Sequence, residues 1–71
     1  MFQKSDESIL NEIAKIDGLG GMTVNERLYV SGLMNEFNIA MLRNKARARQ
    51  ILTWLKVDEP SIILILEEDI S

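Results

Sequence analysis

The sequence contains no cysteine and no histidine among its 71 residues. Without cysteine no disulfide can form, and without either residue type the usual ligands of a structural zinc ion are missing. A chain of this length buries roughly 60% of its unfolded surface, so we expect packing alone, within one chain or between two copies, to supply the stability. The absence of cysteine also fits a reducing compartment, and we expect a cytoplasmic protein.

Long apolar segments are also missing. The longest apolar run, residues 62–66, is far shorter than the roughly 20 residues that cross a bilayer. The first eight residues contain no continuous apolar stretch and already include acidic side chains, so the sequence does not predict a signal peptide. We therefore expect no membrane-spanning helix and no membrane partner.

Motifs for catalysis and cofactor binding are absent as well. Without histidine or cysteine, catalysis would depend on carboxylates or Tyr29, and these show no converging arrangement in the sequence. Glycines at positions 18, 20 and 21 precede a helix start, but a phosphate-binding loop also needs a preceding strand and a Lys-Ser or Lys-Thr pair. We predict no catalytic residue, no cofactor and no metal ion, and a protein that is not an enzyme.

The clearest local signal in the chain is a helix start at Thr23. Glu26 follows three residues later, which is the capping-box spacing: the threonine hydroxyl accepts from the Glu26 N–H, and the carboxylate accepts from the Thr23 N–H. This capping explains Glu26 without a catalytic role. Arg27 is expected on the exposed face or in an ion pair.

Two further helices have recognisable starts. Ser5 and Asp58 are N-cap residue types, and they predict helices over about 6–16 and 59–69. Gly18 suits the left-handed residue that commonly follows a helix, and the first helix should end there.

Apolar residues recur at helical spacing after Thr23 and again after Asn44. This pattern predicts helices over about 24–43 and 45–56, folded into an antiparallel hairpin. Asn44 can end one helix and cap the next, but good helix formers follow it, so one helix over 24–56 stays open. Gly32, inside the first helix, either permits a close helix crossing or is simply tolerated.

The apolar run at residues 62–66 is ambiguous, because β-branched residues also favour a buried strand. We favour a helix, since no second strand is visible to pair with its backbone groups. The sequence thus predicts a single all-α domain, a small bundle of three to four helices centred on the hairpin. Dimerisation could complete such a bundle.

The charges form blocks: residues 38–57 carry five basic and no acidic side chains, while 58–71 carry five acidic and no basic ones. The basic segment could bind nucleic-acid phosphates while Trp54 stacks on a base. The candidate nucleic-acid contacts are Arg43, Lys45, Arg47 and Arg49. The net charge of −3 and the lack of a nucleic-acid-binding motif favour instead a solvated face or pairing with the acidic ends of the chain.

A wide apolar surface on so short a chain favours binding to a protein partner or to a second copy as a homodimer. The candidate interface residues are Tyr29, Val30, Leu33, Phe37, Met41, Trp54, Ile62 and Ile65.

The helix start Met22-Thr23-Val24-Asn25-Glu26-Arg27-Leu28 resembles that of small bacterial proteins of unknown function. Later positions that share in this resemblance are Ser31-Gly32-Leu33, Glu36-Phe37, Ala40 and Ile51-Leu52. The resemblance covers residues 22–57 and implies a bacterial helical hairpin without an activity. Small acidic proteins of this kind often resemble immunity proteins or antitoxins, so binding to a toxin is an alternative function.

Overall fold

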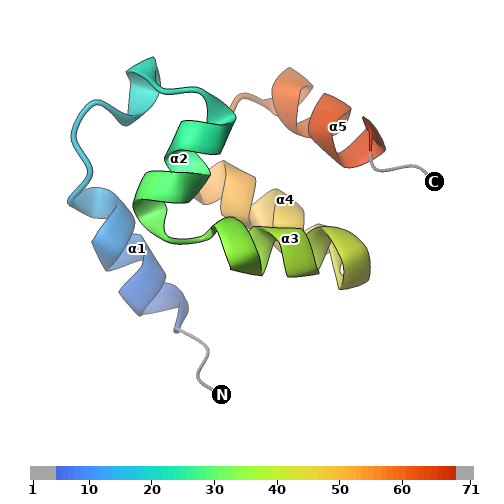
Figure 1. Ribbon diagram of the computed structural model, residues 1–71, viewed down its shortest axis with the longest axis horizontal. Coiled ribbons are helices and arrows are strands. Elements are labelled where there is room, and N and C mark those ends of the chain that lie inside the picture. The colour runs from blue at the N-terminus through green and yellow to red at the C-terminus, as the bar shows by residue number, and fades with distance from the viewer. Residues whose placement is uncertain (1–4, 69–71) are drawn as a thin grey trace.

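The computed structural model describes residues 5–68, in which five α-helices and one short 3-10 helix follow one another (Figure 1). They are α1 (Asp6–Ala14), η1 (Leu19–Gly21), α2 (Val24–Ser31), α3 (Met34–Arg43), α4 (Lys45–Trp54) and α5 (Glu59–Glu68). No strand occurs in residues 5–68, so the all-α prediction is confirmed, and residues 62–66 are helical within α5. Residue 69, the predicted end of the last helix, lies outside the described residues.

The predicted helix starts are confirmed. At α2 the Glu26 N–H donates to the Thr23 hydroxyl at 3.1 Å, and the Thr23 N–H donates to the Glu26 carboxylate at 2.8 Å. The Ser5 hydroxyl accepts from the Ser8 N–H before α1. These side chains satisfy N–H groups that have no partner within the helix.

The single helix predicted over 24–43 is wrong, because Gly32 ends α2. Gly32 has a φ of 77°, a left-handed conformation that glycine adopts without a Cβ clash. Its N–H donates to the Tyr29 carbonyl, and the Leu33 N–H donates to the Leu28 carbonyl, both at 3.1 Å. This is the Schellman arrangement that closes a helix, so Gly32 lies at a helix end and neither expectation for an interior glycine applies.

Asn44 alone joins α3 to α4, as expected for a residue that can end one helix and begin another. Its N–H donates to the Ala40 carbonyl at 2.7 Å, and its side chain accepts from the Arg47 N–H at 3.2 Å. The alternative of one helix over 24–56 is therefore wrong. Helix α4 returns beside α3 (Figure 1), and these two helices form the predicted hairpin.

Two helices end earlier than predicted. Helix α1 ends at Ala14, and Gly18, with a left-handed φ of 75°, instead leads into η1. Helix α4 ends at Trp54, because Lys56 adopts a left-handed φ of 63°. The Lys56 N–H donates to the Thr53 carbonyl there, and the Val57 N–H donates to the Leu52 carbonyl.

Every α-helix contributes to one continuous apolar core. The buried members are Ile9, Ile13, Leu19, Leu28, Leu33, Phe37, Ala40, Ala48, Ile51, Leu52, Leu55, Val57 and Ile62. Helices α1 and α5 lie at opposite ends of the molecule, with α2, α3 and α4 between them (Figure 1). The Cα atoms span 34 × 32 × 15 Å, and so flat a shape leaves several large apolar side chains outside the core.

Arg27 holds the loop before α2 against the end of α4, which differs from the exposed or ion-paired position expected for it. Its guanidinium donates to the carbonyls of Met22 at 3.1 Å, Leu55 at 3.2 Å, Lys56 at 3.0 Å and Gly20 at 3.3 Å. These carbonyls lie at segment ends, where helix geometry supplies no donor. One side chain therefore joins segments separated by about thirty positions in the chain.

Candidate functional site

The structure divides the predicted interface residues into three groups. Buried in the core of the chain itself are Leu33, Phe37 and Ile62. Half-buried against that core are Met41, Trp54 and Ile65. Exposed on α2 are Tyr29, at 78%, and Val30, at 46%. The first group is used in folding and offers no surface, so the exposed pair on α2 defines the candidate site.

Tyr29 and Val30 line an open groove of about 520 Å³ on the surface of α2, which we call the α2 groove. Its lining residues are Met22, Asn25, Glu26, Tyr29, Val30 and Met34. Met22 precedes the cap of α2, and Met34 is the first residue of α3. The break at Gly32 thus makes the groove a feature of two helices and the preceding loop.

The α2 groove has the chemistry of an adaptable apolar contact. The thioethers of Met22 and Met34 are half-buried against the core, and unbranched methionine side chains adjust readily to different partners. Glu26 is the one charged residue in the lining. One of its oxygens accepts from the Thr23 N–H, and the carboxylate has no ion pair among the described residues.

Sequence reasoning missed both methionines of the groove. The single helix predicted over 24–43 places Met34 in its interior, and neither Met22 nor Met34 is among the predicted interface residues. A glycine followed by a buried leucine, as at Gly32 and Leu33, is a helix-end pattern. Weighing that pattern above the apolar periodicity would have placed Met34 at a new helix start.

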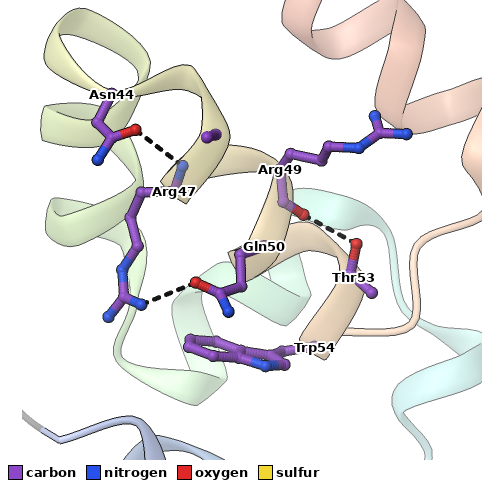
Figure 2. A pocket seen from close by; sticks show the side chains of 7 residues that line it. Asn44, Arg47, Arg49, Gln50, Thr53 and Trp54 are labelled. Atoms are coloured by element: carbon purple, nitrogen blue, oxygen red, sulfur yellow. Dashed lines mark hydrogen bonds between the residues drawn. The ribbon is translucent and has the colours of Figure 1, made fainter.

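A second concave surface runs along α4 and includes part of the predicted nucleic-acid segment (Figure 2). Its volume is about 540 Å³, and it is lined by Asn44, Ala46, Arg47, Arg49, Gln50, Thr53 and Trp54. The Arg47 guanidinium lies 4.9 Å from the centre of the Trp54 ring and donates to the Gln50 side chain at 3.0 Å. It also pairs with Asp6 of α1 at 3.0 Å and with Glu36 of α3 at 3.5 Å.

The four basic side chains do not share one hollow: Arg47 and Arg49 line the α4 surface, and Arg43 and Arg47 line another beside α3. Figure 2 shows Arg47 and Arg49 pointing in opposite directions from α4, and Arg49 pairs with Glu59 of α5. Lys45 donates to the Leu66 carbonyl at 2.8 Å. Arg43 is exposed and has no ion pair in residues 5–68.

This arrangement agrees with pairing between the basic segment and the acidic ends of the chain. A nucleic-acid surface needs several cations free to meet phosphates and a free ring face for stacking. Here Arg47 covers the Trp54 ring, and both Arg47 and Arg49 neutralise carboxylates of the same chain. We therefore base no function on the α4 surface.

In the part of the chain that the structure describes, no group of three acidic side chains is placed to hold a metal ion. No buried side-chain nitrogen or oxygen there lacks a hydrogen-bond partner. The pKa of Asp58 lies below its ordinary value of 3.8 because the Ser61 hydroxyl and N–H donate to its carboxylate, which is the expected cap of α5.

None of the helices within residues 5–68 has the length and apolarity needed to cross a membrane. Comparison of the chain with protein-family models, curated protein sequences and solved structures finds no match. The resemblance of residues 22–57 to small bacterial proteins therefore stays a prediction.

Proposed function

We propose that the protein is a non-enzymatic interaction module that binds a protein partner through the α2 groove. The observation that supports this proposal is the exposure of Tyr29 and Val30 beside two half-buried methionines. Single exposed apolar residues are ordinary on protein surfaces. Apolar side chains that converge on one groove with a polar edge are characteristic of interaction sites.

The residue types of the groove also favour a protein partner. Tyrosine and methionine are enriched in the centres of protein interfaces, and charged residues are depleted there. The core of the chain is already closed without Tyr29 and Val30, so their exposure is not explained by folding. An immunity protein or antitoxin would be one protein of this kind, with a toxin as its partner.

Site-specific photo-crosslinking in the cells that make the protein tests this proposal. A photoreactive phenylalanine derivative replaces Tyr29 in one variant and Leu64 in the control. Leu64 is also exposed, at 62%, but lies on α5. We expect a discrete adduct from position 29 and none of the same mass from position 64.

The mass of the adduct identifies the kind of partner. Twice the chain mass of 8.1 kDa would indicate the predicted homodimer, and any other discrete mass a different protein. No adduct from position 29, or the same adducts from both positions, would contradict the proposal.

A further inference from the structure

The surface around the α2 groove extends along α3 and is almost free of charge. Residues 28–42 contain one charged side chain, Glu36, in a chain of which 27% is charged. Glu36 pairs with Arg47 of α4, and its side chain is 30% exposed. Interfaces are depleted in charged residues relative to the remaining surface, so this depletion marks a larger contact face than the groove alone.

Helix α3 carries the extension of this face. Met34, Asn38 and Met41 follow one another at spacings of four and three and so lie on the same side of the helix. Leu42 lies next to them and, at 80%, is the most exposed large apolar residue in the part of the chain that the structure describes. We treat the α2 groove and the outward side of α3 as one surface and call it the uncharged face; Glu26, in the lining of the groove, is its one charged side chain. The α2 groove lies at one end of the uncharged face, and the exposed Leu42 lies at the other.

In a pair of copies, the α2 groove of one copy can receive the exposed Leu42 of the other. A two-fold axis near Asn38 would place α3 antiparallel to α3 of the partner. Met34 and Leu42 are eight positions apart, or about 12 Å along a helix. Such a pairing would bring Leu42 of one protomer to the groove of its partner, and the reverse contact would form at the same time.

Charge favours a second copy as the occupant. The chain has a net charge of −3, and within residues 5–68 the carboxylates of Glu7, Asp17 and Glu67, outside this face, have no ion pair. Two copies of an acidic protein repel each other through such surfaces, whereas the uncharged face brings only one carboxylate from each copy, Glu26, into the contact. A basic partner would instead be attracted to the acidic surfaces.

A dimer contact of ordinary size would cover a modest part of the surface of the chain. A stable interface buries about 800 Å² on each partner, which is about one sixth of the 5106 Å² surface of the chain. Helices α2 and α3 contain 8 and 10 residues and lie between α1 and α5 (Figure 1).

We propose that the protein forms a two-fold symmetric homodimer through the uncharged face, with Leu42 of each protomer seated in the α2 groove of its partner. This proposal rests on the proposed function and names the partner of the same groove.

Light scattering coupled to gel filtration tests the dimer. We expect a mass of twice 8.1 kDa at tens of micromolar protein. Leu42→Ser should weaken dimerisation at least tenfold, because the contact of an apolar side chain is lost at both symmetric sites. Leu64→Ser removes an equally apolar, exposed side chain from α5 and should leave the dimer unchanged. Circular dichroism checks that both variants keep the fold.

Disulfide trapping tests the register of the two α3 helices. The natural chain has no cysteine, so only the introduced cysteines can form a disulfide. Val30→Cys and Leu42→Cys proteins are mixed and oxidised, and a disulfide heterodimer should form faster than in a mixture of Val30→Cys with Leu64→Cys. Equal rates, an unaffected dimer in Leu42→Ser, or a monomer at 1 mM would overturn the proposed dimer. A monomer that still gives a discrete adduct from position 29 would leave the proposed function standing with a different partner.

Discussion

Replacing Arg27 by methionine should destabilise the fold more than any other substitution of a charged residue in residues 5–68. Methionine keeps most of the side-chain length and the helix propensity but removes all four hydrogen bonds to carbonyl groups. Those bonds join the loop before α2 to the carbonyls of Leu55 and Lys56 after α4. Loss of the guanidinium therefore loosens a contact that no neighbouring side chain duplicates.

The magnitude follows from the surroundings of each bond. The bonds from Arg27 to the Met22 and Leu55 carbonyls are partly buried, and those to the Lys56 and Gly20 carbonyls are exposed. About 1 kcal/mol for each partly buried bond and about half that for each exposed bond, where water replaces the donor, gives about 3 kcal/mol in total. A domain of this size has a free energy of unfolding of roughly 4–10 kcal/mol, so the loss would be a large part of it.

Urea unfolding followed by circular dichroism measures this effect. Arg43→Met is the matched control, because Arg43 is exposed and has no ion pair among the described residues. The free energy of unfolding of the control should stay within about 0.5 kcal/mol of that of the natural protein. Arg27→Lys keeps the charge but loses the planar guanidinium, so its free energy of unfolding should lie between those of the two methionine variants. An Arg27→Met protein within about 0.5 kcal/mol of the natural protein would refute this account of Arg27.

Other substitutions test local features of the fold. Thr23→Ala should lower the free energy of unfolding by about 1 kcal/mol through loss of the capping box, without selectively abolishing partner binding; a loss of binding at unchanged stability would contradict a purely structural role. Two left-handed residues should respond with opposite signs in urea unfolding: Gly32→Ala should destabilise by about 1 kcal/mol or more, and Lys56→Gly should stabilise the fold. The pKa of Asp58 is lowered in the folded state, so its carboxylate stabilises the fold at pH values above its ordinary pKa of 3.8. This stabilisation is lost as the pH falls through the pKa of the folded state. Ser61→Ala should raise the pKa of Asp58 toward 3.8 in a carboxyl NMR titration, and an unchanged pKa would exclude the Ser61 hydroxyl as its cause.

The helix starts could be predicted because each depends on groups within a few residues. Ser5, Thr23, Asn44 and Asp58 accept from N–H groups three positions ahead, so residue type and spacing suffice. The helix end at Gly32 does not follow from the apolar pattern, because helical spacing continues from Val30 to Leu33 and Met34 across the break. The role of Arg27 could not be seen, because its distant partners are backbone carbonyls, which have no signature in the sequence.

The ambiguity of apolar periodicity also explains why only some of the predicted interface residues lie at the candidate site. Periodicity identifies apolar residues on a helix, but it does not say which of two apolar sides meets the core. Leu33 and Phe37 are therefore buried, while their neighbours Tyr29 and Val30 face solvent. The low charge of residues 28–42 is visible in the sequence. It distinguishes this apolar surface from an ordinary solvent-exposed helix face, which carries charged side chains.

In solution we expect the uncharged face of α2 and α3 to be covered by a second copy of the chain. Backbone amide NMR spectra of the isotope-labelled protein, recorded from the low micromolar range to about 1 mM, test it most directly. We expect concentration-dependent shifts at Val30, Met34 and Leu42, with the amides of α1 and α5 unchanged. Spectra that do not change with concentration, or changes centred on α5, would contradict the claim.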